Sequence, residues 1–349
     1  MSRKIRIGVL SFAHYHARFW SEVFRDSPLA EFVGIWDEDK TRGAAAAETY
    51  RARFWPDLEP LLQACEAVAI TSETVHHLRL VEAAAKHKCH ILCEKPPATN
   101  LADCDAIEAL VANAGVTFMQ SFPKRFDPVN HEIKRVLAEG RLGTLALVRV
   151  RHGHFHGLEP HFHKEWFVDP VLGGGGTLLD EGVHAADFLL WMFGEPESVT
   201  AMVSKATLKL PVEDAGIAIF RYQSGMLAEI CTSWSFAAAN DSIEIYGTKG
   251  TVLLAGVDLG SRDITPGGYL RIYEAGSSPK QWQVSDITPR FKTGGFHQQN
   301  ALNFLASLSE GKPPPISLAD GRRALELILT AYRAVETGCE QSIPKPSRQ

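Results

Sequence analysis

The first 122 residues alternate between short apolar runs and helical patterns, and this alternation constrains the fold more than any other feature. Apolar runs span residues 5–10, 32–36, 68–70, 91–93 and 116–122. The segments between them repeat apolar residues every three or four positions, which is typical of helices. Strands that alternate with helices form parallel sheets with right-handed crossovers. The pattern predicts an α/β domain with a doubly wound parallel sheet over residues 1–122.

A different pattern begins at residue 123. After one more helix and a long strand, paired strand runs flank the tight turns at residues 223–225 and 247–250. Such pairs are typical of antiparallel hairpins. We therefore expect a second domain over residues 123–349, of the α+β class, with a large and mostly antiparallel open sheet. Two helices, near 298–308 and after 318, close the chain and are candidates to pack back on the first domain.

Composition excludes several classes of function. The formal net charge of −5 and the pI near 6.3 give no electrostatic reason to expect a nucleic-acid partner. No apolar run approaches the roughly 20 residues that a membrane span needs, and no signal peptide is visible before the first strand. The six cysteines lack CxxC spacing, which favours reduced thiols in a cytoplasmic protein.

The first strand, its turn and the second strand match the layout of a dinucleotide-binding unit. In such units the following helix points its amino terminus at a pyrophosphate, and an acid after the second strand accepts bonds from ribose hydroxyls. Three residues other than glycine stand at the positions of the GxGxxG fingerprint: Ser11, Ala13 and His16. The residues expected to contact the nucleotide here are Gly8, Ser11, Phe12, Ala13, His14 and Asp37.

Two further strand ends are expected at the same edge of the sheet. The third strand ends at Thr71-Ser72-Glu73, with His76 shortly after, and the fourth ends at Glu94-Lys95. Pro96-Pro97 prevents the fourth strand from continuing, so Lys95 stays at the ligand-binding edge. An ammonium group there can stabilise negative charge on a substrate oxygen. The alternative is a solvated charge pair that closes an ordinary strand.

A second chemical centre follows a run of four glycines, Gly173–Gly176. Asp180 and His184 are four residues apart, so on one helix they would share a face. A carboxylate one turn from an imidazole can orient it, fix its tautomer and raise its basicity. The alternative is an acid that pairs with a surface histidine. We expect the glycines to permit close approach of another backbone or of a ligand.

The motifs together resemble those of a known family. They lie in Cys93–Ala98, Lys124–Pro128, Glu139–Gly143, Gly174–His184 and Tyr246–Gly250. In this order they are similar to the Gfo/Idh/MocA oxidoreductases, the glucose–fructose oxidoreductase and inositol dehydrogenase family. The resemblance covers nearly the whole chain. At Ser72-Glu73 the sequence departs from the Pro-Asn that is usual in the family beside the nicotinamide ribose.

The resemblance implies an amino-terminal Rossmann domain that holds NAD(P) and a second domain whose open sheet mediates assembly, here as a homodimer or homotetramer. It implies that Lys95 polarises the reacting oxygen, that His184 is the acid/base and that Asp180 is its partner. It also makes Glu94 a neighbour of the cofactor. The residues expected to contact substrate are Lys95, Arg125, His154, His163, Trp166, Asp180 and His184.

The implied reaction is hydride transfer between a nicotinamide and a secondary hydroxyl of a sugar, cyclitol or related polyol. Asp37 favours NAD because a carboxylate repels a 2′-phosphate. NADP stays an alternative because the cations Lys40 and Arg42 are nearby in the sequence. Two alternatives remain: a non-catalytic nucleotide- or sugar-binding sensor with the same fold, and an NAD-dependent glycoside-cleaving enzyme.

A histidine cluster follows the long strand expected over Thr144–Phe155. His152, His154 and His156 have the parity of one strand face, and His161 and His163 follow. We expect a polar wall of the substrate site without a bound metal. The alternative is a zinc site of three imidazoles.

Overall fold

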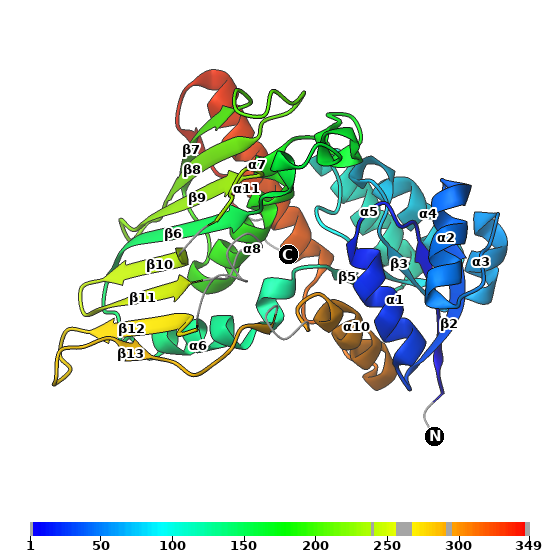
Figure 1. The fold of residues 1–349 in the computed structure, drawn as a ribbon, viewed down its shortest axis with the longest axis horizontal. Helices are drawn as coiled ribbons and strands as arrows, with labels where there is room; N and C mark the ends of the chain where they lie inside the picture. Colours follow the sequence, from blue (N-terminus) through cyan, green and yellow to red (C-terminus); the bar gives the residue numbers. More distant parts are fainter. Residues whose placement is uncertain (1–2, 239–240, 256–266, 291–294, 346–349) are drawn as a thin grey trace. The chain divides into compact units, whose positions relative to one another are not determined.

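The computed structural model describes residues 3–238, 241–255, 267–290 and 295–345. The chain divides into two compact units, each described here by itself (Figure 1). The first unit contains Met1–Pro123, Val171–Gly174 and His297–Arg322. The second unit contains Lys124–Pro170, Gly175–Phe296 and Arg323–Gln349.

The first unit is built on a five-stranded sheet of order β2-β1-β3-β4-β5 in which every pair is parallel. The expected doubly wound parallel sheet is therefore confirmed. The strands are β1 (Ile5–Leu10), β2 (Ala30–Trp36), β3 (Ala67–Ile70), β4 (His90–Cys93) and β5 (Phe118–Gln120). The helices are α1 (His16–Asp26), α2 (Lys40–Tyr50), α3 (Leu58–Ala64), η1 (Thr74–His76), α4 (His77–Lys86), α5 (Leu101–Ala114) and α10 (Gln298–Glu310).

The central strands of this sheet are buried on both faces. All four residues of β3 and the last three of β4 are fully buried, as helices on both faces of a parallel sheet require. Strand β1 pairs with β2 on one side and with β3 on the other, so the strand order reverses there. Ligands bind outside the carboxyl ends of the strands at such a reversal. Helix α10 contacts α1 and β1, so the first closing helix belongs to this unit.

Local signals fix several helix ends in the first unit. The Asp39 carboxylate caps α2 by accepting from the N–H groups of Thr41 and Arg42. Gly115 ends α5 in the left-handed conformation, as expected for a glycine at that position. The cap on α2 is the one that bears on the site, because it fixes where the Arg42 side chain starts.

The second unit is built on a nine-stranded sheet of order β13-β12-β11-β10-β6-β9-β8-β7-β14. Every pair is antiparallel except β6 with β9, which confirms the mostly antiparallel sheet and both expected hairpins. The strands are β6 (Leu145–Gly153), β7 (Ser198–Ser204), β8 (Ala215–Arg221), β9 (Leu227–Ser233), β10 (Asp241–Gly247), β11 (Gly250–Ala255), β12 (Leu270–Glu274), β13 (Gln283–Val284) and β14 (Gln341–Ser342).

Helical segments accompany this sheet. The second closing helix, α11, begins at the expected Leu318 in the first unit and enters the second unit at Arg323. Ser317 and Asp320 form the reciprocal bonds of a capping box at its start. The helical segments are η2 (Pro123–Phe126), α6 (Pro128–Ala138), η3 (His156–Leu158), η4 (Phe162–Lys164), η5 (Trp166–Val168), α7 (Thr177–Asp180), α8 (Gly182–Phe193) and α11 (Leu318–Thr337).

The strand expected over Thr144–Phe155 is shorter in the structure, because β6 ends at Gly153. A Cβ on Gly153 would lie 2.2 Å from the carbonyl oxygen of Ser233, so the end of β9 leaves room only for glycine. His156 therefore lies in η3. The expectation that it shares one strand face with His152 and His154 is wrong.

The glycine run before the second motif is explained by packing. A Cβ on Gly176 would lie 2.1 Å from the carbonyl oxygen of Glu213. The Glu213 carboxylate also accepts from the N–H groups of Gly176 and Leu178, at 3.0 and 3.1 Å, and so caps α7. At Gly176 the close neighbour is therefore another part of the backbone.

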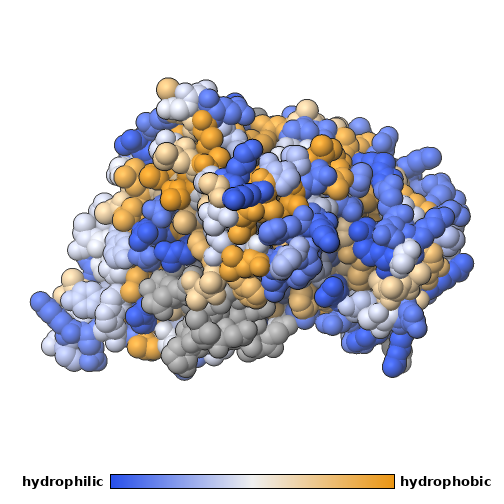
Figure 2. Space-filling model, turned by 45° about the horizontal axis from the view of Figure 1, so that its top comes forward, coloured by the Kyte–Doolittle hydropathy of each residue, from blue (hydrophilic) through white to orange (hydrophobic). Residues whose placement is uncertain are grey.

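One face of the nine-stranded sheet lies exposed. Strand β8 alternates strictly, with Ala218 and Phe220 buried and Ile217 and Ile219 exposed. Met202 on β7 is 80% exposed. Hydrophobic side chains are visible among hydrophilic ones on the surface in Figure 2. Among the helices that the structure describes, none combines the length and the apolar character needed to cross a membrane.

Candidate active site

Four strand ends of the first unit bring predicted residues to one edge of the sheet. Ser11 follows β1, Asp37 follows β2, Thr71 follows β3 and Glu94 follows β4. Because β2, β1, β3 and β4 are neighbours in this order, the residues form a continuous row. Thr71 joins two of these ends, since its hydroxyl donates to the Ser11 carbonyl at 2.6 Å and its own carbonyl accepts from the N–H of His14 at 2.9 Å.

Ser11 takes the backbone conformation of the missing first glycine. Its φ is +77°, in the left-handed region that favours glycine. The Ser11 hydroxyl holds this turn by accepting from the N–H of Ala13 at 3.1 Å. The N–H of Phe12 donates to Asp37 Oδ2 at 2.7 Å. Gly8 lies inside β1, where a Cβ would meet Leu61 and Cys65, and its expected contact with the nucleotide stays a prediction.

His14 fills the space beside the turn. The ring is buried, and its Nδ1 accepts from the N–H of His16 at 3.2 Å. Burial lowers the pKa of His14 well below its usual value, and the neighbouring His16 and Lys95 charges lower it further. The ring is therefore neutral with its proton on Nε2. Lys95, the expected electrophile, is itself 3% exposed.

Glu94 supports the segment that carries Lys95. Its carboxylate lies 2.8 Å from Nδ1 of His16 and accepts from the N–H of Lys95 at 3.1 Å and from the Ser121 hydroxyl at 3.3 Å. Burial raises the pKa of Glu94 to about 7, against the opposing effect of the Lys95 charge. The His297 ring, at the start of α10, packs on His16 with 3.9 Å between centroids.

His77 connects two of the predicted segments. Its ring nitrogens lie 3.0 Å from the carbonyl oxygen of Pro96 and 3.3 Å from that of Ser72. It therefore ties the end of β3 to the segment after β4. The predicted neighbour, His76, lies in η1 and is only partly buried.

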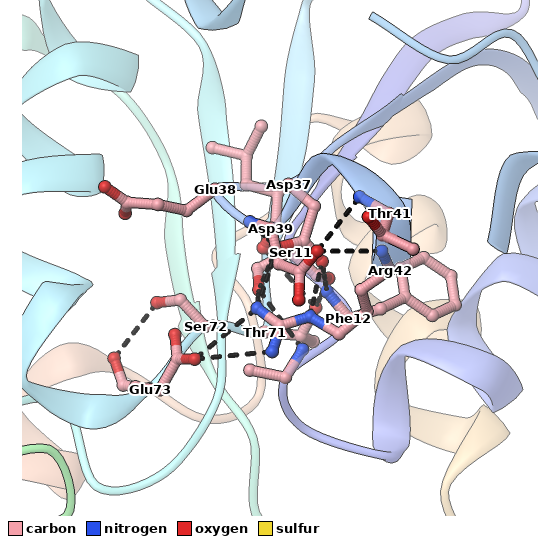
Figure 3. Close-up of polar contacts among 12 residues, drawn as sticks. Ser11, Phe12, Asp37, Glu38, Asp39, Thr41, Arg42, Thr71, Ser72 and Glu73 are labelled. Atoms are coloured by element: carbon pink, nitrogen blue, oxygen red, sulfur yellow. Dashed lines mark hydrogen bonds and ion pairs between the residues drawn. The ribbon is translucent and has the colours of Figure 1, made fainter. Parts of the chain in front are cut away.

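Asp37 is surrounded by donors, as Figure 3 shows. Its carboxylate accepts from the N–H groups of Phe12 and Asp39 and forms a two-bond ion pair with Arg42. The Arg42 guanidinium also donates to the Ser11 hydroxyl at 3.2 Å and lies 3.4 Å from Glu73 Oε1. Arg42, noted in the sequence only as a cation near Asp37, is thus the centre of this cluster.

In the second unit, Asp180 and His184 stand on consecutive short helices. The single helix expected through both residues is broken at Glu181, which separates α7 from α8. Asp180 Oδ2 accepts from Nε1–H of Trp234 at 3.2 Å. His184 is 6% exposed, and its ring meets the His152 ring edge-on with 4.9 Å between centroids.

Glu181 connects the two chemical features of the second unit. Its carboxylate lies 3.1 Å from Nε2 of His152 and 3.2 Å from Nε2 of His154. Glu181 is the first variable residue between Asp180 and His184, and His152 at the end of β6 and His154 just after it both reach its carboxylate. No local spacing predicts the contact, because both histidines are distant from Glu181 in sequence.

Among the residues that the structure describes, two groups of side chains have ligand atoms close enough to hold a metal: His14, His16 and Glu94, and His154, Asp180 and Glu181. In each group one imidazole is unsuited to ligation. Nδ1 of His14 and of His154 accepts the N–H two residues later, at 3.2 Å in both cases. The proton is then on Nε2, which leaves no lone pair there for a metal. These groups fit hydrogen-bonded networks better than metal sites.

Three residues expected at the substrate are engaged in other contacts. Arg125 forms a two-bond ion pair with Asp187 on α8, at 2.6 and 3.0 Å. Nε2 of His163 lies 2.7 Å from the Gly157 carbonyl oxygen, and the residue is exposed. Trp166 stacks on Phe167, with 4.0 Å between ring centroids. Of the expected substrate residues in this unit, His154, Asp180 and His184 lie in the network around Glu181.

The fold and this set of residues define an oxidoreductase with a nucleotide-binding Rossmann unit and a separate sheet unit. Residues 5–122 match the family model described as "Oxidoreductase family, NAD-binding Rossmann fold". Residues 130–253 match the model of the Gfo/Idh/MocA C-terminal domain. The chain belongs to the Gfo/Idh/MocA family, which confirms the resemblance seen in the sequence.

Relatives and solved structures agree with this assignment. The chain is 26% identical to D-apiose dehydrogenase of Paraburkholderia graminis, over 95% of this chain and 87% of that protein. It is 28% identical to myo-inositol 2-dehydrogenase of Thermotoga maritima, over 78% of each. An oxidoreductase of Agrobacterium radiobacter, crystallised with NAD+, L-tartaric acid and magnesium, has the same fold, with a TM-score of 0.82, 22% identity and coverage of 98% and 99%.

Proposed function

We propose that this protein is an NAD(P)-dependent dehydrogenase that moves a hydride between the nicotinamide and a secondary hydroxyl of a sugar, cyclitol or related polyol. One observation carries the proposal. The chain belongs to a family of NAD-binding oxidoreductases and has Lys95, Asp180 and His184 in buried or half-buried positions. The named relatives that act on D-apiose and myo-inositol support the class of substrate.

The residues of the first unit fit a dinucleotide. The left-handed Ser11 gives the turn the shape that the glycine fingerprint otherwise supplies, and the turn leads into α1. Thr71 and Ser72 would face the nicotinamide half. The resemblance implies the same half for Glu73, but its 3.4 Å contact with Arg42, beside Asp37, favours the adenosine half for both residues. When bound, the nicotinamide supplies the carbon that accepts or returns the hydride.

The chain's own groups would handle the proton and the charge. The Lys95 ammonium would donate to the reacting oxygen and stabilise the developing alkoxide. The His184 imidazole would take the hydroxyl proton, and Asp180, held by Trp234, would orient it. Glu181 with His152 and His154 would form the polar wall beside His184.

A dehydrogenase screen tests this proposal. Purified protein is mixed with NAD or NADP and a panel of sugars, cyclitols, sugar acids and aryl glycosides. Reduced nicotinamide and released aglycone are followed by absorbance. We expect turnover with at least one polyol. Nucleotide binding without turnover on any member would favour the sensor alternative, and release of an aglycone without net reduction of nucleotide would favour glycoside cleavage.

The exposed face of the nine-stranded sheet supports a proposal about assembly. Leu147, Met202, Ile217 and Ile219 are large apolar side chains on neighbouring or nearby strands, each at least 37% exposed. We propose that copies of the chain associate through this face as a homodimer or homotetramer. Ile217→Lys should shift the mass measured by light scattering toward the monomer, and an unchanged mass would refute this.

We also propose a cytoplasmic location. The six cysteines are free thiols, and four of them are buried. Reduced cysteines in such number are typical of reducing compartments. Fractionation of the source cells, with the protein detected by antibody, tests this.

A further inference from the structure

The adenosine ribose of a dinucleotide is expected beside the acid that ends β2, which is Asp37. A carboxylate at this place usually accepts from the ribose hydroxyls and repels the 2′-phosphate of NADP. The question is whether the Asp37 carboxylate can do either. The inference rests on the proposed nucleotide binding but not on turnover.

The Asp37 carboxylate has no acceptor capacity left. Oδ1 accepts from Asp39 N–H at 3.0 Å and from Arg42 Nη2 at 2.7 Å, with the Ser11 hydroxyl at 3.4 Å. Oδ2 accepts from Phe12 N–H at 2.7 Å and from Arg42 Nε at 2.8 Å. Two carboxylate oxygens offer about four lone-pair positions, and all are used. The side chain is also 0% exposed, so a ribose hydroxyl could reach it only by displacing Arg42 or opening the turn.

Arg42 also cancels the charge of Asp37. Burial acts to lower the pKa of Arg42, but the hydrogen bonds and charge of Asp37 outweigh burial and raise it, so the guanidinium stays cationic. A two-bond pair of opposite unit charges presents little net charge to a ligand. The repulsion of a 2′-phosphate therefore needs another source.

Glu73 supplies a second carboxylate at the same place, and the single charge of Arg42 cannot compensate both acids. It follows β3, and Figure 3 shows the Arg42 guanidinium reaching from Asp37 toward it. Its contact with Arg42 is long, 3.4 Å, against the 2.7 and 2.8 Å contacts that Arg42 makes with Asp37. The Glu73 side chain is 14% exposed, and within the described residues its Oε2 has no hydrogen-bond partner.

We propose that Glu73, in place of Asp37, accepts from the adenosine ribose hydroxyls and excludes a 2′-phosphate. Asp37 is a positioning residue that holds Arg42 and the turn after β1. Arg42 by itself would favour NADP, because a guanidinium that is not paired with Glu73 can bind the 2′-phosphate. The charge of Glu73 keeps the cluster net negative and so selects NAD.

The test is fluorescence titration with NADH and with NADPH, without substrate. In Glu73→Gln we expect NADPH to bind about tenfold more tightly, as removal of one charge near a doubly charged phosphate predicts. NADH affinity should change less than about threefold, because the glutamine carbonyl still accepts from a hydroxyl. Added salt should reduce the discrimination of the wild type more than that of the variant.

Glu38→Gln is the matched control. Glu38 is the next acid after Asp37, but it is exposed and pairs with Arg79 at the surface. It should leave the NADH-to-NADPH ratio unchanged. An unchanged ratio in Glu73→Gln, or an equal change in Glu38→Gln, would overturn the proposal.

The Asp37→Asn variant separates the positioning role from ribose recognition. It should lower the melting temperature and weaken both nucleotides, because the amide cannot accept all the donors around Asp37. If Asp37→Asn keeps normal stability and loses affinity for NADH but not for NADPH, the assignment of ribose recognition to Glu73 is contradicted. If the NADH-to-NADPH affinity ratios change as predicted but the protein oxidises no polyol, the proposed dehydrogenase function is refuted and the assignment of Glu73 stands.

Discussion

The imidazole of His16 lies 2.8 Å from the carboxylate of Glu94, and both side chains are buried. This contact joins the start of α1 to the end of β4, the two segments that carry the nucleotide turn and Lys95. Glu94 therefore acts as the internal support of the site. Its raised pKa makes that support sensitive to pH.

We predict that Glu94→Gln changes how stability depends on pH. Burial raises the pKa of Glu94 from 4.5 to about 7, so between these values the folded protein holds a proton that the unfolded chain has lost. Stability from this group is therefore present at low pH and is lost as pH rises through the window, by roughly 2–3 kcal/mol. Urea unfolding of both proteins at about pH 5 and about pH 8 measures the difference.

The comparison with Glu94→Gln is needed because His14 acts in the opposite direction. The pKa of His14 is lowered in the folded protein, so the unfolded chain binds a proton there more readily than the folded one. The stability that neutral His14 contributes is therefore lost as the pH falls below the usual pKa of histidine. The His14 contribution is common to both proteins and cancels in the difference. Parallel pH profiles for wild type and Glu94→Gln would refute the raised pKa of Glu94.

We predict that the wild type binds NAD more tightly than NADP. The Asp37→Ala variant should reduce the difference in affinity between NAD and NADP. It frees Arg42 to bind a 2′-phosphate, and it removes the carboxylate that holds the turn after β1. Isothermal titration with both nucleotides tests the order. A clear preference of the wild type for NADP would contradict the charge argument.

We predict that Lys95→Ala and His184→Ala each reduce turnover by at least about a hundredfold, as loss of an electrophile or an acid/base does. Nucleotide binding should survive in both. Lys164→Ala and His161→Ala, which alter exposed side chains, are matched controls and should keep normal rates. Near-normal turnover in Lys95→Ala or His184→Ala would remove that residue from the mechanism.

We predict that the purified protein contains no stoichiometric metal. Nδ1 of His154 accepts a backbone N–H, so its Nε2 faces Glu181 as a donor. Chelator should leave melting temperature and activity unchanged. Elemental analysis that found about one zinc per chain, with loss of stability on its removal, would show instead that His154 changes tautomer to bind it.

The fold was largely predictable because its signals are local. The periodicity of the first half located β1 residue for residue, and the turn residues located both hairpins of the second sheet. The errors came where distant backbone intervenes. Strand β6 ends at Gly153, where it pairs with Ser233, the last residue of β9. The motif helix breaks at Glu181 although its apolar pattern continues.

The site was predictable in its motif residues and not in their partners. Lys95 and Asp37 follow strands, and strand ends can be read from sequence. The residues that hold them are set by tertiary packing: Trp234 reaches Asp180 from the end of β9, and His297 reaches His16 from α10. No spacing in the sequence links such pairs. Arg42 is close to Asp37 in the sequence, but only the structure shows that the Arg42 guanidinium pairs with the Asp37 carboxylate and cancels its charge.

The most direct measurement of the central claim is isotope transfer. A polyol substrate labelled with deuterium at each carbinol carbon is incubated with the protein and NAD, and the reduced nucleotide is analysed by mass spectrometry and NMR. The dehydrogenase account predicts one deuterium on C4 of the nicotinamide, and at least about a hundredfold less labelled nucleotide with His184→Ala over the same time. Bound NAD that acquires no deuterium from any polyol would contradict it.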